Sequence, residues 1–171
     1  MNAVAESTHS YEEMHKKCLS NIPYDAGKIV SAAGGTELLS TVLVIDDDVA
    51  MTETLSVMLE PKAFKVFTAH TSEEGIAAAS WLQPDVIVLD LHLPGMDSSL
   101  CRTIRESSGV PILVLSALNK PGVAAQALDD GADDYLTKPV PSGVLVAHLN
   151  NLIRRARAER DAYQKGSLQG F

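Results

Sequence analysis

The chain has 171 residues, 46% of them apolar, and its formal net charge is −8. This length suits one domain with extensions, and the negative charge argues against a chain built mainly to coat nucleic acid or an anionic membrane. The cysteines, Cys18 and Cys101, stand far apart without metal-ligand spacing, which favours a reducing compartment over a disulfide framework. Residues 1–30 contain no apolar block of signal-peptide length, and no stretch approaches a membrane span. We therefore expect a cytoplasmic protein without membrane contact.

Residues 1–39 carry the weakest pattern in the sequence. Apolar residues recur at helical spacing in one part of this segment, at Tyr11, Met14, Cys18 and Leu19. This spacing is compatible with one short amphipathic helix, but a mobile N-terminal extension is the interpretation that we favour. Ser31-Ala-Ala-Gly-Gly35 is typical of a linker. We predict the folded domain at residues 40–157 and a C-terminal linker or tail at residues 158–171.

From residue 40 onward, strand and helix patterns alternate along the chain. Short apolar runs predict strands of a buried parallel sheet, at residues 41–45, 64–68, 86–89, 110–115 and 133–136. Amphipathic periods predict the intervening helices, at residues 50–60, 72–81, 98 or 99–106, 121–130 and 141–157. Pro61 is expected to end the first helix and Ser72 to cap the second.

Five alternating strands and helices imply an α/β fold with a parallel sheet and helices on both faces. The doubly wound strand order 2-1-3-4-5 suits this count. It places the first and third strands side by side, at the switch point where open α/β sheets bind ligands outside the carboxyl ends of their strands.

Acidic residues follow these two strands at the point where each strand ends. Asp46, Asp47 and Asp48 follow the first strand, and Asp90 follows the third. Carboxylates gathered at one sheet edge repel one another, and a hard divalent cation relieves that repulsion. Because oxygen ligands suit Mg²⁺, we predict a magnesium site at Asp46, Asp47 and Asp90. Asp48 is interpreted as the cap of the following helix, with no metal role.

Ser116 and Lys138 are expected at the same edge because they follow the fourth and fifth strands. Each alone would be an ordinary turn or surface residue, but beside Asp90 they have complementary roles. Asp90, aimed out of a rigid strand, can attack phosphorus as a carboxylate nucleophile and form an acyl phosphate. Lys138 can neutralise the transferred group as a point charge, and Ser116 can donate a hydrogen bond to one of its oxygens.

Four blocks occur in the sequence in this order: Val42-Leu-Val-Ile-Asp46-Asp47-Asp48, Asp90-Leu-His-Leu-Pro-Gly-Met-Asp97, Leu113-Val-Leu-Ser116-Ala117 and Gly131-Ala-Asp-Asp-Tyr-Leu-Thr-Lys138-Pro139. Together they resemble the receiver domain of two-component response regulators over about residues 40–157. The resemblance is closest to receivers of winged-helix DNA-binding response regulators. It implies a flavodoxin-like receiver fold and a signalling protein rather than an enzyme, one that catalyses only its own phosphoryl transfer and slow dephosphorylation.

The resemblance also implies residue roles. Asp90 would be phosphorylated by a sensor histidine kinase or a phosphotransfer protein. Mg²⁺ would be ligated by Asp47, Asp90 and the backbone carbonyl of His92, with Asp46 holding metal-bound waters.

Ser116 and Tyr135 would form the switch pair, in which the hydroxyl moves toward the phosphoryl group and the ring turns inward. A half-buried strand tyrosine without such a role is the alternative for Tyr135. The bond between Lys138 and Pro139 is expected to be cis. The change would pass to the surface of the fourth helix, fifth strand and fifth helix, and would control dimerisation and a transcriptional output.

The chain departs from the family in two places. Ser98-Ser99-Leu100 stands where a glycine and one further residue usually precede the helix, so a shorter and stiffer start of that helix is expected. The winged-helix subfamily usually has a basic, an acidic and an arginine residue where this chain has Ala124, Val144 and His148. Charges for that homodimer are largely absent, and an apolar contact through Val144 is a candidate replacement. DNA binding is expected only through an output domain outside this sequence, and a stand-alone receiver is the alternative.

Three other functions fit these residues less well. A metal-dependent phosphatase with an aspartate nucleophile usually needs a second carboxylate two residues later, where this chain has His92. Dinucleotide binding would require a glycine-rich loop after the first strand, where aspartates stand instead. A receiver-like scaffold that takes no phosphate would not need the complete set of site residues.

Overall fold

The computed structural model describes residues 39–91, 99–118, 120 and 122–167. The chain divides into two compact units, Met1–Leu39 and Ser40–Phe171, and the described helices and strands all belong to the second unit. The helix and linker expected within residues 1–38, and the loop that contains His92, lie outside the described residues. Within the described ranges, every helix is too short or too polar to span a bilayer.

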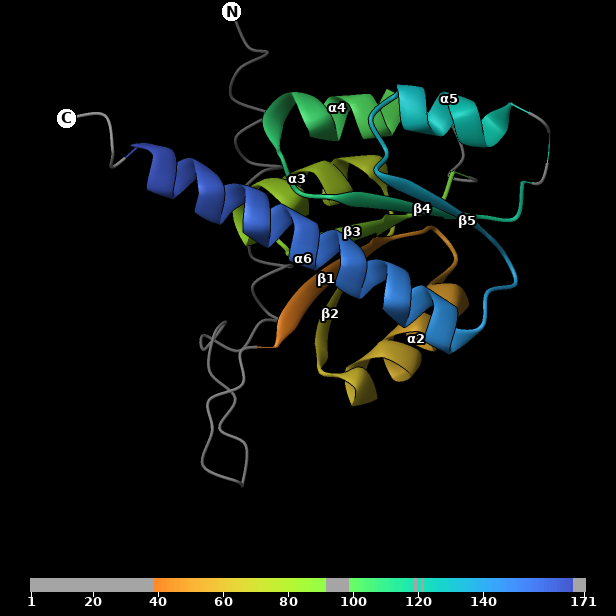
Figure 1. The fold of residues 1–171 in the computed structure, drawn as a ribbon. Helices are drawn as coiled ribbons and strands as arrows, with labels where there is room; N and C mark the ends of the chain where they lie inside the picture. Colours follow the sequence, from red (N-terminus) through yellow and green to blue (C-terminus); the bar gives the residue numbers. More distant parts are fainter. Residues whose placement is uncertain (1–38, 92–98, 119, 121, 168–171) are drawn as a thin grey trace, which may run out of the picture. The chain divides into compact units, whose positions relative to one another are not determined.

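Five parallel strands form one sheet in the order β2-β1-β3-β4-β5 (Figure 1). The strands are β1 (Ser40–Ile45), β2 (Phe64–Ala69), β3 (Val86–Leu89), β4 (Ile112–Ser116) and β5 (Asp134–Thr137). This confirms the predicted doubly wound α/β fold with strand order 2-1-3-4-5. Ile45 is paired with Leu89 in the β1–β3 register, so Asp46 and Asp90 follow the two strands at the same level.

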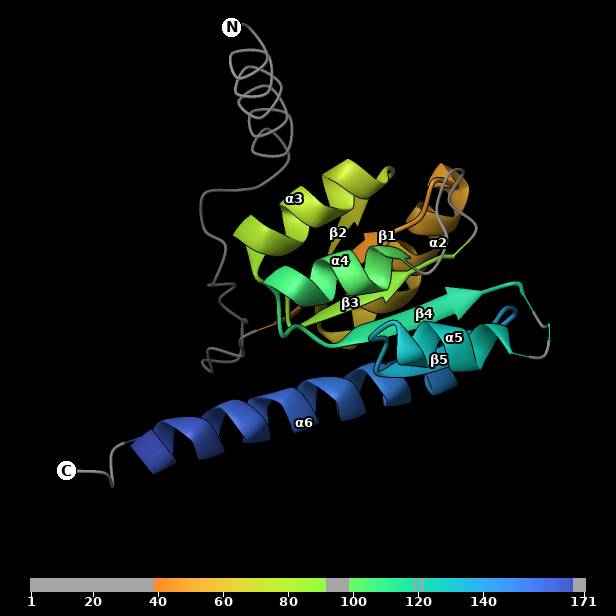
Figure 2. The same cartoon turned by 90° about the horizontal axis from the view of Figure 1, so that it is seen from above.

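Helices cover both faces of the sheet, and Figure 2 shows α6 on the side opposite to α3 and α4. The helices are α2 (Val49–Leu59), α3 (Ser72–Leu82), α4 (Ser99–Ser107), α5 (Val123–Asp129) and α6 (Ser142–Ser167), with a 3-10 turn, η1 (Glu60–Lys62), after α2. Apolar residues of α3, α4 and α5 pack in one core cluster with alternate strand residues. Those of α2 and α6 pack in a second cluster with the remaining strand residues. Both faces of the sheet are therefore covered by packed helices, and this packing holds the ends of the strands in position.

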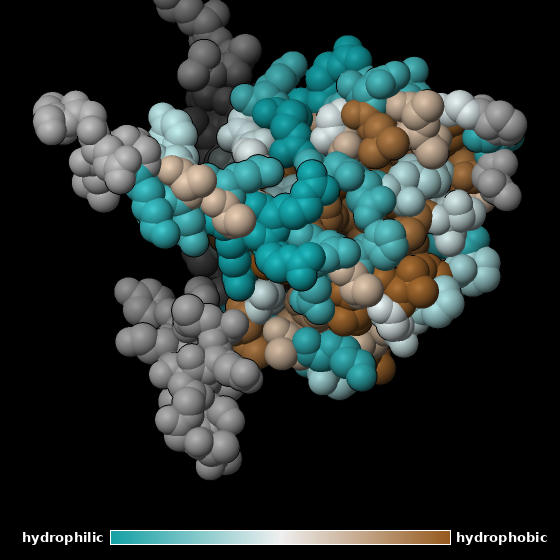
Figure 3. All heavy atoms as spheres, in the orientation of Figure 1, coloured by the Kyte–Doolittle hydropathy of each residue, from teal (hydrophilic) through white to brown (hydrophobic). Residues whose placement is uncertain are grey.

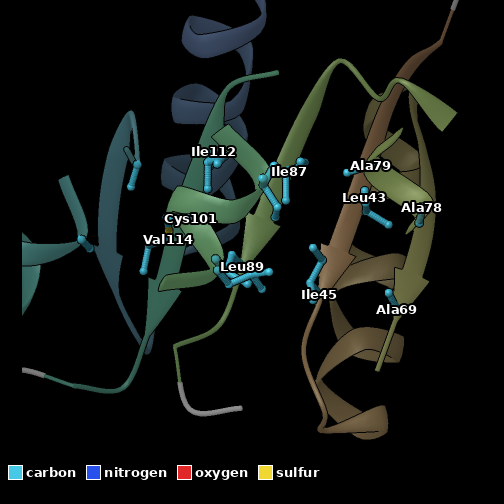
Figure 4. Packing of buried hydrophobic residues seen from close by; sticks show 14 residues of the cluster. Leu43, Ile45, Ala69, Ala78, Ala79, Ile87, Leu89, Cys101, Ile112 and Val114 are labelled. Carbon is cyan, nitrogen blue, oxygen red and sulfur yellow. The ribbon is translucent and has the colours of Figure 1, made fainter. Parts of the chain in front are cut away.

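Strand β3 is buried along its whole length, as expected for a parallel strand covered on both faces. Ile87 and Leu89 belong to one core cluster, which also contains Cys101 of α4 (Figure 4). Burial is the main cause that raises the pKa of the Cys101 thiol to about 11, and the negative charge of Asp130 is the second. Cys101 is therefore an uncharged packing residue at neutral pH.

Two predictions of helix ends are wrong. Thr71, and not Ser72, caps α3, since its backbone is extended and its hydroxyl accepts a hydrogen bond from the Glu74 amide at 3.2 Å. Ser72 is already the first helical residue, which excludes it from the capping position. The end predicted for the last helix near Arg157 is too early. The helix continues to Ser167, and between Gly143 in its first turn and Gly166 in its last turn the sequence has no glycine or proline that would end it earlier.

Gly75 allows α3 to pack closely against β1. A Cβ atom at position 75 would lie 2.7 Å from Cδ1 and 2.9 Å from Cγ2 of Ile45, so one of the two elements would have to shift. We expect Gly75→Ala to lower the free energy of unfolding by about 1–2 kcal/mol in urea titrations, although alanine is the better helix former. Ser80→Ala, at an exposed position of the same helix, is the matched control and should stay within about 0.5 kcal/mol. A Gly75→Ala variant more stable than the wild type would contradict this packing argument.

Candidate functional site

Asp46, Asp90 and Lys138 meet at the carboxyl edge of the sheet, although Asp46 and Lys138 are 92 residues apart. The Lys138 ammonium donates hydrogen bonds to Oδ2 of Asp90 at 2.8 Å and to Oδ2 of Asp46 at 3.0 Å. The exposed fraction is 3% for the Asp46 side chain, 9% for Asp90 and 14% for Lys138. One cation is therefore shared by two carboxylates in a place where water screens their charges poorly.

Backbone hydrogen bonds continue the sheet pairing by one residue beyond the ends of β1, β3 and β5, to Asp46, Asp90 and Lys138. Each of three amides donates to a strand carbonyl at 2.9–3.1 Å, in the pairs Asp90–Ile45, Asp46–Ala69 and Lys138–Ser116. The sheet itself, rather than a loop, thus sets the main-chain position of each functional group. The Lys138–Pro139 peptide bond is cis, as the resemblance implied.

Two opposing effects act on the charge of Lys138. Burial disfavours the ammonium ion and lowers its pKa, but the hydrogen bonds to Asp90 and Asp46 raise the pKa by more, so the net direction is upward. Lys138 is therefore charged at neutral pH. Because the folded pKa is raised, its stabilising contribution is complete below the pKa of an unfolded lysine, about 10.4, and is lost as the pH rises through the folded value.

Ser116 and Tyr135 are connected through the main chain of Leu118. Ser116 is fully buried at the end of β4, and its hydroxyl oxygen accepts a hydrogen bond from the Leu118 amide at 3.2 Å. The Tyr135 hydroxyl donates to the Leu118 carbonyl at 2.6 Å. Ser116 therefore lies at the predicted sheet edge, with its hydroxyl engaged by the loop after β4.

The three consecutive aspartates after β1 differ in their surroundings. Asp46 is buried and Asp47 is exposed, whereas Asp48 caps α2 by accepting a hydrogen bond from the Met51 amide at 3.2 Å. Among the described residues, no three or more Asp, Glu, His or Cys side chains are grouped so that they could hold a metal ion. The carbonyl of His92 lies outside those residues. The metal ligation inferred from the sequence therefore stays a prediction.

His70 is a site residue that the sequence reasoning missed. It follows β2, and its ring Nδ1 lies 3.1 Å from the carbonyl oxygen of Asp46. The predicted strand order contained the signal, because a residue after the second strand must lie beside the residue that follows the first.

Comparison with known proteins identifies this arrangement. The family described as response regulator receiver domain matches residues 42–150. The chain belongs to this family. The confirmed strand order and the residues at the strand ends agree with the resemblance inferred from the four sequence blocks.

The receiver is similar to curated transcriptional regulators. It is 40% identical over 121 residues to the KDP operon transcriptional regulatory protein KdpE of Escherichia coli, covering 70% of this chain and 54% of KdpE. It is 37% identical over 115 residues to the DNA-binding response regulator MtrA of Mycobacterium tuberculosis, covering 67% of this chain and 50% of MtrA. The chain thus spans about half the length of these relatives.

Solved structures show the same fold. A two-component response regulator from Clostridium difficile has a TM-score of 0.65 and 32% identity, covering 68% of this chain and 97% of that one. The BeF3-activated N-terminal receiver domain of RstA from Klebsiella pneumoniae has a TM-score of 0.64 and 28% identity, covering 67% and 99%.

In this receiver, the acidic residues around the start of β5 have partners within the chain. The Asp133 carboxylate accepts hydrogen bonds from the Arg105 guanidinium at 2.6 Å and from the Ile112 amide at 2.8 Å. The Asp134 carboxylate lies 2.5 Å from Nδ1 of His148, which stands where the winged-helix subfamily usually has arginine. Both carboxylates are thus engaged inside one molecule.

Replacing Lys138 removes the positive charge that Asp46 and Asp90 share, so the repulsion between these two carboxylates should lower the stability of the fold. We expect Lys138→Met to lower the free energy of unfolding by about 3 kcal/mol in urea titrations without divalent cations, because two buried carboxylates lose their counter-charge. Asp90→Asn in the same background should recover about 1 kcal/mol or more. Lys62→Met, which changes an exposed lysine, is the control and should stay within about 0.5 kcal/mol. Strictly additive effects of the changes at positions 138 and 90 would contradict the shared charge.

Proposed function

We propose that this receiver is a phosphorylation-controlled switch in which Asp90 accepts a phosphoryl group in the presence of Mg²⁺. The donor would be a sensor histidine kinase or a phosphotransfer protein, and the receiver itself would act in the cytoplasm. The observation that carries the proposal is the cluster of Asp46, Lys138 and Asp90, in which a nucleophilic carboxylate at a strand end already contacts a charged amine. Membership of the receiver family supports the same reading.

The phosphoryl transfer uses the carboxylate of Asp90 as nucleophile. An Asp90 oxygen forms a bond to phosphorus while the bond from phosphorus to the donor's leaving group breaks, and the leaving group takes that electron pair. The product is an acyl phosphate, in which Asp90 has lost its own charge and carries the phosphoryl charges instead. Lys138, which donates to Asp90 at 2.8 Å, is positioned to pair with those new charges.

The residues present suit a hard divalent cation. Two buried carboxylates share one ammonium group, so the cluster keeps a net negative charge, and its donors are oxygens of the kind that Mg²⁺ prefers. Asp46, Asp47, Asp90 and the carbonyl of His92 would hold the ion. When bound, Mg²⁺ supplies positive charge that allows phosphate oxygens to approach the carboxylates.

The link through Leu118 supports a role for Ser116 and Tyr135 as the switch. We infer that the Ser116 hydroxyl leaves the Leu118 amide to donate to a phosphoryl oxygen. The loop after β4 then moves, and with it the carbonyl that accepts the Tyr135 hydroxyl. Such a loop movement shifts the equilibrium between two conformations of the protein surface.

The surface that would report the switch consists of α5, β5 and α6. Asp133 and Asp134 are engaged within the chain, while Leu128 of α5 is 45% exposed and Val144 of α6 is 40% exposed. We infer that a homodimer formed through this surface would use apolar contact more than ion pairs between subunits. Transcriptional control would then need an output domain outside the present sequence.

Phosphorylation by a small donor tests the central step. Incubation with acetyl phosphate and Mg²⁺ should add one phosphoryl group in intact-mass spectra, and Asp90→Asn should remove that species. Asp129→Asn, which changes an exposed aspartate, should leave it unchanged. Sustained turnover of generic phosphate esters, without a stable phosphorylated species, would favour the phosphatase alternative and contradict the proposal.

Neighbouring aspartates provide a test of the cation ligands. Asp47→Asn should raise the Mg²⁺ concentration for half-maximal phosphorylation by about tenfold or more, because one charged oxygen ligand is lost. Asp48→Asn should have little effect, since asparagine also caps helices. Equal effects of the two substitutions would assign the loss to charge in general and would contradict a specific ligand role for Asp47.

A further inference from the structure

His70 lies beside Asp46 at the end of β2, because Ile45 and Ala69 are the last pair in the β1–β2 register. Its ring Nδ1 lies 3.1 Å from the Asp46 carbonyl oxygen. A carbonyl oxygen only accepts hydrogen bonds, so Nδ1 must carry the proton in this contact. The neutral ring protonated at Nδ1 and the imidazolium ion both satisfy that condition, so the contact does not require a particular charge state.

The main chain of His70 is held by the start of α3. Its amide donates to Oε2 of Glu74 at 3.0 Å, and the Glu74 amide donates to the capping hydroxyl of Thr71 at 3.2 Å. This arrangement is a variant of the capping box, in which the glutamate reaches the residue before the cap. The imidazole ring therefore extends from a rigid junction between β2 and α3.

Every polar group of Asp46 has a partner. Its amide and its two carboxylate oxygens contact, in turn, the carbonyl of Ala69, the amide of Asp48 and the ammonium group of Lys138. The remaining group, the carbonyl oxygen, is the one that the His70 ring contacts. That carbonyl belongs to the peptide group that joins Asp46 to Asp47. Holding it therefore sets the direction in which the main chain of Asp47 leaves the sheet.

We propose that His70 is a positioning residue for the cation site: by donating Nδ1–H to the Asp46 carbonyl, it fixes the peptide group that carries both Asp46 and Asp47. This inference rests on the proposed function, in which those two aspartates serve the cation. His70 would act through Asp46 and is not itself proposed as a ligand of the ion. Groups that orient metal ligands in this way typically change metal affinity by about 10–100-fold when they are removed.

Asparagine and glutamine at position 70 provide a matched pair of variants. The asparagine amide nitrogen can occupy the place of the histidine Nδ1, whereas the longer glutamine side chain places its nitrogen near the position of Nε2. We expect His70→Gln to raise the Mg²⁺ dissociation constant, measured by calorimetry, by about tenfold, and His70→Asn to stay within about twofold of the wild type.

Phosphorylation by acetyl phosphate separates positioning from a general structural effect. His70→Gln should raise the Mg²⁺ concentration for half-maximal rate by about tenfold, while the rate at saturating Mg²⁺ stays within about twofold. Equal Mg²⁺ affinities for the wild type and both variants, equal losses in both variants, or a loss confined to the saturated rate would each overturn the role of His70.

The same measurements distinguish this inference from the proposed function. Binding of Mg²⁺ without phosphorylation of Asp90 in the wild type would refute the proposed switch, and the calorimetric comparison of the two variants would still decide the role of His70. A wild type that binds no Mg²⁺ would overturn both proposals.

Discussion

The ammonium group of Lys138, shared between the carboxylates of Asp46 and Asp90, is the contact around which the rest of the structure is arranged. Two carboxylates this close to each other and this deeply buried would repel strongly without it. A single lysine compensates only one of the two charges. The cluster therefore keeps a net negative charge, which in the proposed function would attract a further cation to the carboxylate that accepts the phosphoryl group.

Parallel-sheet topology explains how residues so far apart in sequence meet. Parallel strands end at a common edge, and the order β2-β1-β3-β4-β5 puts the two acidic strand ends beside each other. Core clusters on both faces hold the strands in register. In Figure 3, hydrophilic side chains predominate on the visible face of the C-terminal half of α6, and the core residues of that helix, Leu145, Leu149, Leu152 and Ile153, all lie in its first half. The packing that stabilises the domain is thus also what sets the distances within the site.

The sequence predicted the fold well because its signals were local and strong. Continuous apolar runs such as Val86–Leu89 mark buried parallel strands, and 2-1-3-4-5 is one of the common doubly wound orders that suits five of them. Asp46, Asp90, Ser116 and Lys138 were assigned to one edge because each stands close after the end of a predicted strand. Their shared location needed no knowledge of side-chain packing.

The sequence did not predict the contacts that depend on side-chain packing. Lys138 was expected to act on a transferred phosphoryl group, and its bonds to both carboxylates emerged only from the structure. The same holds for His70, whose ring contacts the Asp46 carbonyl from the end of β2. It also holds for the main chain of Leu118, whose amide contacts Ser116 and whose carbonyl contacts Tyr135. Whether Thr71 or Ser72 caps α3 depends on which of the two has the extended backbone of a capping residue. Both residues carry a hydroxyl group, so the sequence alone did not distinguish them.

Locating the phosphoryl group chemically tests the account most directly. After reaction with acetyl phosphate and Mg²⁺, borohydride reduces an aspartyl acyl phosphate to homoserine and releases phosphate, so peptide sequencing by mass spectrometry can find the modified position. The account predicts homoserine at position 90 and aspartate at positions 46 and 47. Homoserine at another position, or a phosphoryl group that resists borohydride and remains on a hydroxyl side chain, would contradict it.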